Sequence, residues 1–194
     1  MVESDFLGKS RAPLEMVTRI AKIYDGFHSL RKPTLALLNG YTTAGGFEAM
    51  ISCDFAIAEE DAKIGDFHIR RGMTGGGAPI YRLPRILGMR RAKEMMMSGK
   101  IISGTKAAEW QLVNEVCPNG GLDEAADAFL KPFLEQSPYT MWITKMSANR
   151  GLDADTNTLM TLEHFATALS MQSNDAVEAV SAFLGKRDPE WTAS

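Results

Sequence analysis

Residues 39–54, NGYTTAGGFEAMISCD, contain the features that decide the fold of this 194-residue chain. The apolar run at residues 34–38 just before them is typical of a buried strand. The polar, glycine-containing start of the quoted stretch then indicates a turn. After the turn, Phe47, Met50 and Ile51 fall at helical spacing. We therefore expect a strand, a tight turn and a helix in direct succession.

The sequence on either side predicts a mixed α/β region. Residues 14–30 place apolar side chains at helical spacing, and a Lys-Pro pair ends that pattern. Downstream, residues 55–58 favour a buried strand and residues 63–65 a short one, followed by a glycine-rich loop at residues 72–77.

The rest of the chain changes from mixed to purely helical character. Helices are predicted from Pro79 to a Ser-Gly break at residues 98–99, then a helix over residues 105–112 and an extended segment over residues 113–116. Beyond Pro118 only helical patterns remain. We predict an α/β core over residues 1–118 and an all-helical region over residues 119–194.

Composition narrows the class of protein. A formal net charge of −3 gives no broad attraction for nucleic acid or an anionic membrane surface. The two cysteines, Cys53 and Cys117, are far apart and form no zinc-type pattern, so we expect neither a disulfide nor a metal site. No segment resembles a signal peptide or a bilayer-spanning helix, which favours a soluble, cytoplasmic protein.

The turn and the helix after it form the candidate site. The first N–H groups of a helix lack intrahelical partners and point beyond the turn, where they favour negative charge. Gly45 and Gly46 allow a ligand to approach closely, and Glu48 lies in the first turn of the same helix. Such N–H groups would stabilise the oxyanion of a thioester enolate, with Glu48 as acid or base. The alternative is a purely structural turn in which Glu48 only interacts with the helix dipole, and spacing alone does not decide between them.

Three motifs together resemble the enoyl-CoA hydratase/isomerase (crotonase) family. NGYTTAGGFEAMISCD is similar to the family segment in which a glycine-rich turn precedes a helix with a catalytic glutamate. A glycine-rich loop and a Leu-Pro-Arg helix follow in the family's order, and FLGKRDPEW is similar to its C-terminal pattern. The resemblance covers nearly the whole chain from Lys32. It implies a ββα spiral core followed by a helical region that forms trimers or hexamers.

The resemblance assigns roles to three residues. Gly45 matches a backbone oxyanion donor, and Glu48 matches the first catalytic glutamate. The second glutamate of typical hydratases is replaced by His68. Histidine exchanges protons near neutral pH, so His68 either takes over the missing role or is a structural residue.

The resemblance also implies a function and an incomplete core. It favours a lyase of acyl-CoA metabolism that hydrates an α,β-unsaturated acyl-CoA and needs no cofactor beyond the coenzyme A of its substrate. An isomerase or thioester hydrolase of the same fold, or a non-catalytic paralogue, remains open. Family members carry a further N-terminal segment with the other oxyanion donor. A truncated gene model, a fragment and one piece of a split protein all remain open as explanations, and we expect the chain alone to hydrate poorly.

Overall fold

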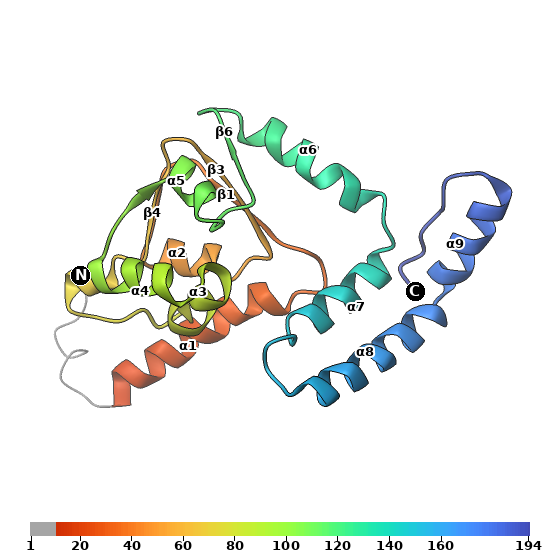
Figure 1. The fold of residues 1–194 in the computed structure, drawn as a ribbon, viewed down its shortest axis with the longest axis horizontal. Coiled ribbons are helices and arrows are strands. Elements are labelled where there is room, and N and C mark those ends of the chain that lie inside the picture. Colours follow the sequence, from red (N-terminus) through yellow and green to blue (C-terminus); the bar gives the residue numbers. More distant parts are fainter. Residues whose placement is uncertain (1–10) are drawn as a thin grey trace. The chain divides into compact units, whose positions relative to one another are not determined.

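The computed structural model describes residues 11–194, which form two compact units (Figure 1). The first contains residues 11–30 and 34–128, and the second contains residues 31–33 and 129–194. The mixed α/β architecture predicted for the chain is confirmed. The domain boundary near residue 118 remains a prediction.

The first unit begins with helix α1, Arg11–Ser29, which ends shortly before the Lys-Pro pair, as predicted. Five shorter helical segments follow within this unit, all in the described part of the chain. They are α2 (Gly45–Met50), the 3-10 helix η2 (His68–Arg71), α3 (Pro79–Leu87), α4 (Met89–Ser98) and α5 (Gly104–Glu109).

The strands of the described residues form two three-stranded sheets. One sheet has the order β1-β3-β6 and is parallel throughout; the other has the order β2-β4-β5, with β2 and β4 parallel and β4 and β5 antiparallel. The strands are β1 (Leu35–Leu38), β2 (Tyr41–Thr43), β3 (Phe55–Glu59), β4 (Lys63–Gly65), β5 (Ile102–Ser103) and β6 (Glu115–Cys117).

The two sheets arise from a repeated strand-turn-strand unit. β1 and β3 pair in one sheet, whereas the strands that follow them, β2 and β4, pair in the other. Each unit therefore places its first strand in one layer and its second strand in the next. The helix carrying Glu48 starts directly after such a unit, at the end of β2.

The core of the first unit supports this arrangement. Phe47, Ile64, Leu83 and Met95 are completely buried in one apolar cluster. Burying a side chain of this size contributes about 1.5–3 kcal/mol. Phe47 comes from the apolar face predicted for α2, so its burial fixes the side of the helix on which Glu48 lies.

Two strands were absent from the sequence-based prediction. β2 lies in the segment that we interpreted as a turn, and β5 is only two residues long. Both are recognisable mainly through pairing with β4, for example Thr42 with Ile64 and Ile102 with Ile64. Such distant pairing leaves no periodic signal in a segment of two or three residues.

Helices make up the second unit, as predicted for residues 119–194. Its helices are α7 (Pro138–Ala148), α8 (Thr156–Met171) and α9 (Asn174–Gly185), and the division between the units falls within α6 (Leu122–Leu134). Ser137, Asp155 and Ser173 precede α7, α8 and α9, and each accepts hydrogen bonds from first-turn N–H groups. Side-chain N-caps of this kind typically stabilise a helix by about 1 kcal/mol.

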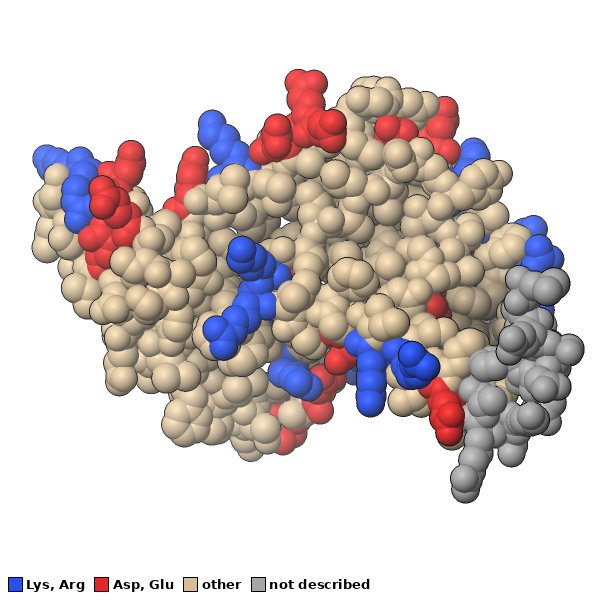
Figure 2. All heavy atoms as spheres, turned by 180° about the vertical axis from the view of Figure 1, so that it is seen from behind, with Lys and Arg blue, Asp and Glu red and all other residues tan. Residues whose placement is uncertain are grey.

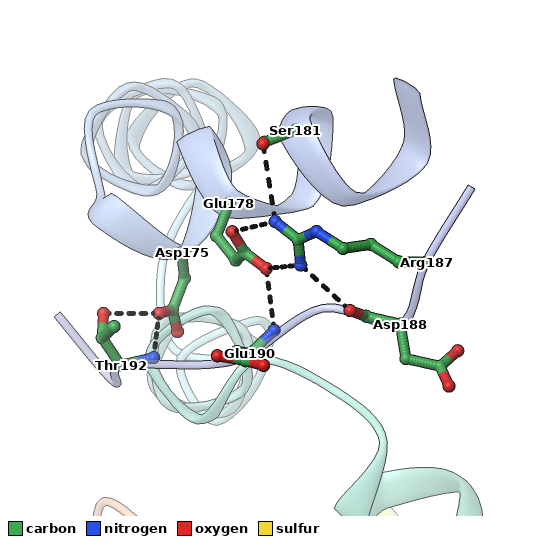
Figure 3. Close-up of polar contacts among 7 residues, drawn as sticks. All are labelled: Asp175, Glu178, Ser181, Arg187, Asp188, Glu190 and Thr192. Atoms are coloured by element: carbon green, nitrogen blue, oxygen red, sulfur yellow. Dashed lines mark hydrogen bonds and ion pairs between the residues drawn. The ribbon is translucent and has the colours of Figure 1, made fainter. Parts of the chain in front are cut away.

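Helix α9 holds the C-terminal tail through two carboxylates (Figure 3). Glu178 accepts hydrogen bonds from both terminal nitrogens of Arg187, at 2.5 and 2.9 Å, and from the Glu190 N–H at 2.8 Å. Asp175 accepts bonds from the N–H and hydroxyl of Thr192, at 2.7 and 2.9 Å. The tail motif FLGKRDPEW thus contributes residues that anchor it to its own helix.

Acidic and basic side chains are interspersed on the face shown in Figure 2. No helix in the part of the chain described by the structure is long and apolar enough to cross a bilayer.

Candidate active site

Glu48 lies on α2 with its carboxylate buried at the glycine-rich loop. Only 3% of the residue is exposed. Its Oε1 atom accepts a hydrogen bond from the Gly77 N–H at 2.7 Å. A buried carboxylate requires such a partner, because an unpaired one carries a large desolvation cost. The loop therefore fixes the orientation of the carboxylate predicted to act as an acid or base.

His68 lies next to Glu48. Its Nε2 atom is 3.9 Å from Glu48 Oε1, and 14% of its side chain is exposed. Its other ring nitrogen, Nδ1, is 2.7 Å from Oδ1 of Asp66, which is itself buried. The structure thus places the His68 ring between the carboxylates of Asp66 and Glu48.

Two glycines of the loop make room for these side chains. A Cβ atom at Gly75 would lie 2.7 Å from Glu48 Oε1 and 3.2 Å from His68 Nδ1. A Cβ atom at Gly77 would lie 2.8 Å from the Glu48 carboxyl carbon and would clash with the ring of Tyr24. From the sequence this loop was recognisable only as glycine-rich; in the structure it packs against Glu48 and His68.

Tyr24 of α1 also reaches the site, next to Gly45. A Cβ atom at Gly45 would lie 2.8 Å from the Tyr24 hydroxyl oxygen. Burial raises the pKa of Tyr24, and the nearby Glu48 carboxylate raises it further. Tyr24 therefore keeps its proton and presents a neutral hydroxyl to the first residue of α2.

The backbone around the site is strained at three residues other than glycine. Ala44, Phe67 and Ala78 have φ values of 50°, 62° and 74°, in the region that favours glycine. They precede α2, η2 and α3, respectively. Strain of this kind costs on the order of 1–3 kcal/mol per residue and often occurs at functional sites.

One of these strained residues links two parts of the site. The Ala44 N–H donates to the Asp66 carbonyl at 3.2 Å. The turn before Gly45 is therefore tied to the segment that carries Asp66 and His68.

The structure brings together the residues predicted from the sequence. Gly45 is the first residue of the helix that bears Glu48, and His68 lies beside the Glu48 carboxylate. Sequence reasoning missed Asp66 and Tyr24. The Asp-x-His spacing was a usable signal for Asp66, whereas nothing near Tyr24 in the sequence links it to a glutamate on a different helix.

Metal binding receives no support from the side chains. In residues 11–194, no group of three or more His, Cys, Asp or Glu side chains is arranged to hold a metal ion.

Comparison with protein families identifies the architecture around this site. A model of the enoyl-CoA hydratase/isomerase family matches residues 12–194. The chain belongs to the enoyl-CoA hydratase/isomerase family. Its fold matches the crystal structure of an enoyl-CoA hydratase from Bacillus anthracis with a TM-score of 0.89 and 29% identity, over 96% of this chain and 72% of that chain. The crotonase-like fold predicted from the sequence is confirmed.

Curated relatives show similarity over most of this chain. Mouse mitochondrial methylglutaconyl-CoA hydratase is 30% identical over 90% of this chain and 57% of its own length. A short-chain-enoyl-CoA hydratase of Clostridium acetobutylicum is 30% identical over 87% of this chain and 65% of its own length. The chain therefore spans a little more than half the length of the first of these relatives and about two thirds of the second.

Proposed function

We propose that this chain forms the acid-base part of an acyl-CoA enzyme that hydrates an α,β-unsaturated thioester. The observation that carries the proposal is the 3.9 Å separation between Glu48 Oε1 and His68 Nε2. A carboxylate and an imidazole, two groups that serve as acids or bases in enzymes, thus lie beside the helix start carrying Gly45. Relatives named as hydratases of enoyl-CoA and methylglutaconyl-CoA support the substrate class.

The proton balance of hydration requires two groups of this kind. As the water oxygen bonds to the β-carbon, one group removes a proton from the water, and the electrons of the double bond move toward the thioester oxygen. The other group then delivers a proton to the α-carbon. A final transfer between Glu48 and His68 resets the pair. At 3.9 Å the two atoms are too far apart for a direct hydrogen bond, so this last transfer requires the two side chains to approach each other or a water to bridge them.

Charge on the thioester oxygen needs donors as well. We assign one of them to the backbone N–H of Gly45, and resemblance to the family leads us to expect the second from the family's N-terminal segment. Removing one oxyanion donor typically lowers turnover by about 10² to 10³. Coenzyme A enters as part of the substrate, and the mechanism uses no further cofactor.

An isomerase or a thioester hydrolase is the second candidate. The observation that favours it is the replacement of the second acidic residue by His68, because moving a proton between two carbons needs a single base such as Glu48. A non-catalytic paralogue is disfavoured by the retention of both Gly45 and Glu48. A cytoplasmic location stays a prediction.

The test compares this chain with a longer version that carries the N-terminal segment of a family member. Hydration of crotonyl-CoA is followed by loss of the conjugated-thioester absorbance. Isomerisation of a 3-enoyl-CoA is followed by gain of that absorbance, and hydrolysis by release of free thiol.

We expect the longer version to hydrate crotonyl-CoA and this chain alone to be slower by at least about 100-fold, the typical effect of one lost oxyanion donor. Isomerisation or hydrolysis without hydration would replace the proposal by the second candidate. Equal hydration rates for the two versions would show that this chain completes its own oxyanion site.

A further inference from the structure

We propose that Asp66 is a positioning residue that holds His68 with its proton on Nδ1, so that Nε2 is the nitrogen that exchanges protons. This inference rests on the proposed acid-base role of His68. It adds a second carboxylate to the site. Asp66 would act through His68, whereas a second glutamate would act directly.

The hydrogen bond between Asp66 and His68 has a defined direction. Asp66 Oδ1 and His68 Nδ1 are 2.7 Å apart, the distance of a strong, charge-assisted bond. An ionised carboxylate only accepts hydrogen bonds. The proton between the two atoms therefore belongs to Nδ1, and in the neutral ring Nε2 is left as the acceptor.

The other ring nitrogen of His68 lies near Glu48. With Nδ1 held by Asp66, Nε2 is the ring atom that lies 3.9 Å from Glu48 Oε1. The ring thus separates the two carboxylates and turns its proton-accepting atom toward Glu48. If the proton were on Nε2, Nδ1 would be a hydrogen-bond acceptor. The Asp66 carboxylate is also an acceptor, so the hydrogen bond between the two residues would be lost.

The backbone is shaped to form this pair. Phe67, between the two residues, has φ of 62° and ψ of −17°, a left-handed conformation that is unfavourable for a bulky side chain. The His68 N–H also donates to the Asp66 carbonyl, at 2.8 Å. This tight turn brings together two side chains that would be separated in an extended segment, and the cost at Phe67 indicates that the arrangement is specified by its surroundings.

Burial strengthens the effect of the pair. Asp66 is 3% exposed, so water competes little for its carboxylate. A negative charge held there stabilises the imidazolium that forms whenever His68 accepts a proton. The same carboxylate therefore sets the orientation of the ring without touching substrate.

The decisive measurement is the tautomer of His68 in this chain, obtained from imidazole ¹⁵N chemical shifts at a pH high enough for the ring to be neutral. The sequence has only three histidines, so His68→Gln identifies the relevant signals. We expect a protonated Nδ1 and an unprotonated Nε2. A protonated Nε2 would overturn the proposal, and this test needs neither catalytic activity nor a folded Asp66 variant.

A kinetic measurement separates positioning from mere bracing of the turn. In the longer, active version, Asp66→Asn should lower kcat by at least about 100-fold with little change in KM; in an established Asp-His pair the same exchange costs about 10⁴ in turnover. Asp61→Asn is the matched control, because Asp61 is exposed and its carboxylate pairs with Asn119 instead.

The two experiments fail independently of the proposed function. If the Nδ1–H tautomer is found but Asp66→Asn keeps the parent kcat, the positioning role is wrong and the pair is structural. If the enzyme proves to be an isomerase or a hydrolase, the same comparison is made with that reaction. A loss of kcat in Asp66→Asn but not in Asp61→Asn still supports the inference.

Discussion

The Glu48 carboxylate and the Gly77 N–H are joined by a 2.7 Å hydrogen bond between α2 and the glycine-rich loop. Since Glu48 is buried, this bond contributes to both the stability and the orientation of the side chain. A glutamine at residue 48 retains an oxygen that accepts the same bond but loses the ability to exchange protons. The two properties are therefore separable by one substitution.

We predict that Glu48→Gln lowers turnover of the active enzyme by at least about 100-fold, the usual effect of removing a general acid or base. The melting temperature should change little, because the bond to Gly77 is retained. Steady-state hydration of crotonyl-CoA and a thermal melt test both parts. Activity within severalfold of the parent would rule out a catalytic role for Glu48.

Crowding the glycine-rich loop should damage the same site indirectly. In Gly75→Ala the new methyl group would lie 2.7 Å from Glu48 Oε1 and 3.2 Å from His68 Nδ1, so both side chains must move. Overpacking of this kind typically costs about 1–3 kcal/mol of stability. We expect a lower melting temperature together with a loss of kcat of at least about tenfold, since small misplacements of reacting groups are costly.

Gly40→Ala is the matched control for this substitution. A Cβ atom at Gly40 would meet nothing within 4 Å. Its kcat should stay near that of the parent enzyme. Equal kcat values for Gly75→Ala and Gly40→Ala would show that the loop tolerates the methyl group and does not position the acid-base pair.

His68 should give the enzyme a pH dependence that a structural histidine would not. If it replaces the second glutamate, the rate should show a pH dependence that is absent in His68→Gln. The measurement is kcat/KM of crotonyl-CoA hydration across the neutral range for the two proteins. An identical profile in both would return His68 to a structural role.

The sequence predicted the parts of this site that depend on local pattern. Phe47, Met50 and Ile51 are all buried, so helical periodicity identified the inner face of α2 correctly. Gly45 and Glu48 followed from the turn and the helix start, with the family resemblance deciding between a functional and a structural turn.

What the sequence did not reveal depends on distant contacts. Tyr24 reaches Gly45 from α1, and Gly77 reaches Glu48 from the loop before α3. Neither contact has a periodic or compositional signal, because each is fixed only when the strand-turn-strand units stack. Asp66 differs, since its spacing from His68 was visible, but only the turn at Phe67 makes the two side chains meet.

The helical unit should associate with further copies of the protein. Phe165 on α8 is 67% exposed, and on α9 Phe183 and Leu184 are 83% and 75% exposed. A monomer seldom leaves this much apolar surface in water. We predict a trimer or a hexamer by light scattering at micromolar concentration.

Phe183→Asp should shift this assembly toward the monomer. Because the side chain is largely exposed within its own chain, the substitution should leave the circular dichroism spectrum unchanged. A monomer found for the parent protein at micromolar concentration would contradict the prediction directly.

The anchored C-terminal tail should loosen in acid, and Glu178 should account for part of the effect. Hydrogen bonds from the Arg187 side chain and the Glu190 N–H lower the pKa of Glu178 from 4.5 to about 2. A carboxyl whose pKa is lowered by folding stabilises the folded state above its unfolded pKa and loses that contribution as the pH falls. The loss should therefore occur between about pH 4.5 and pH 2.

In Glu178→Gln the melting temperature should be lower than in the parent protein at pH 7, and the difference should shrink across this window. Glu163→Gln removes an exposed carboxylate from α8 and serves as the matched control for a general charge effect. Added salt should also reduce the difference at pH 7, because the Glu178–Arg187 pair is partly solvent-exposed. A difference between parent and Glu178→Gln that is constant from pH 7 to pH 2 would show that ionisation of Glu178 does not anchor the tail.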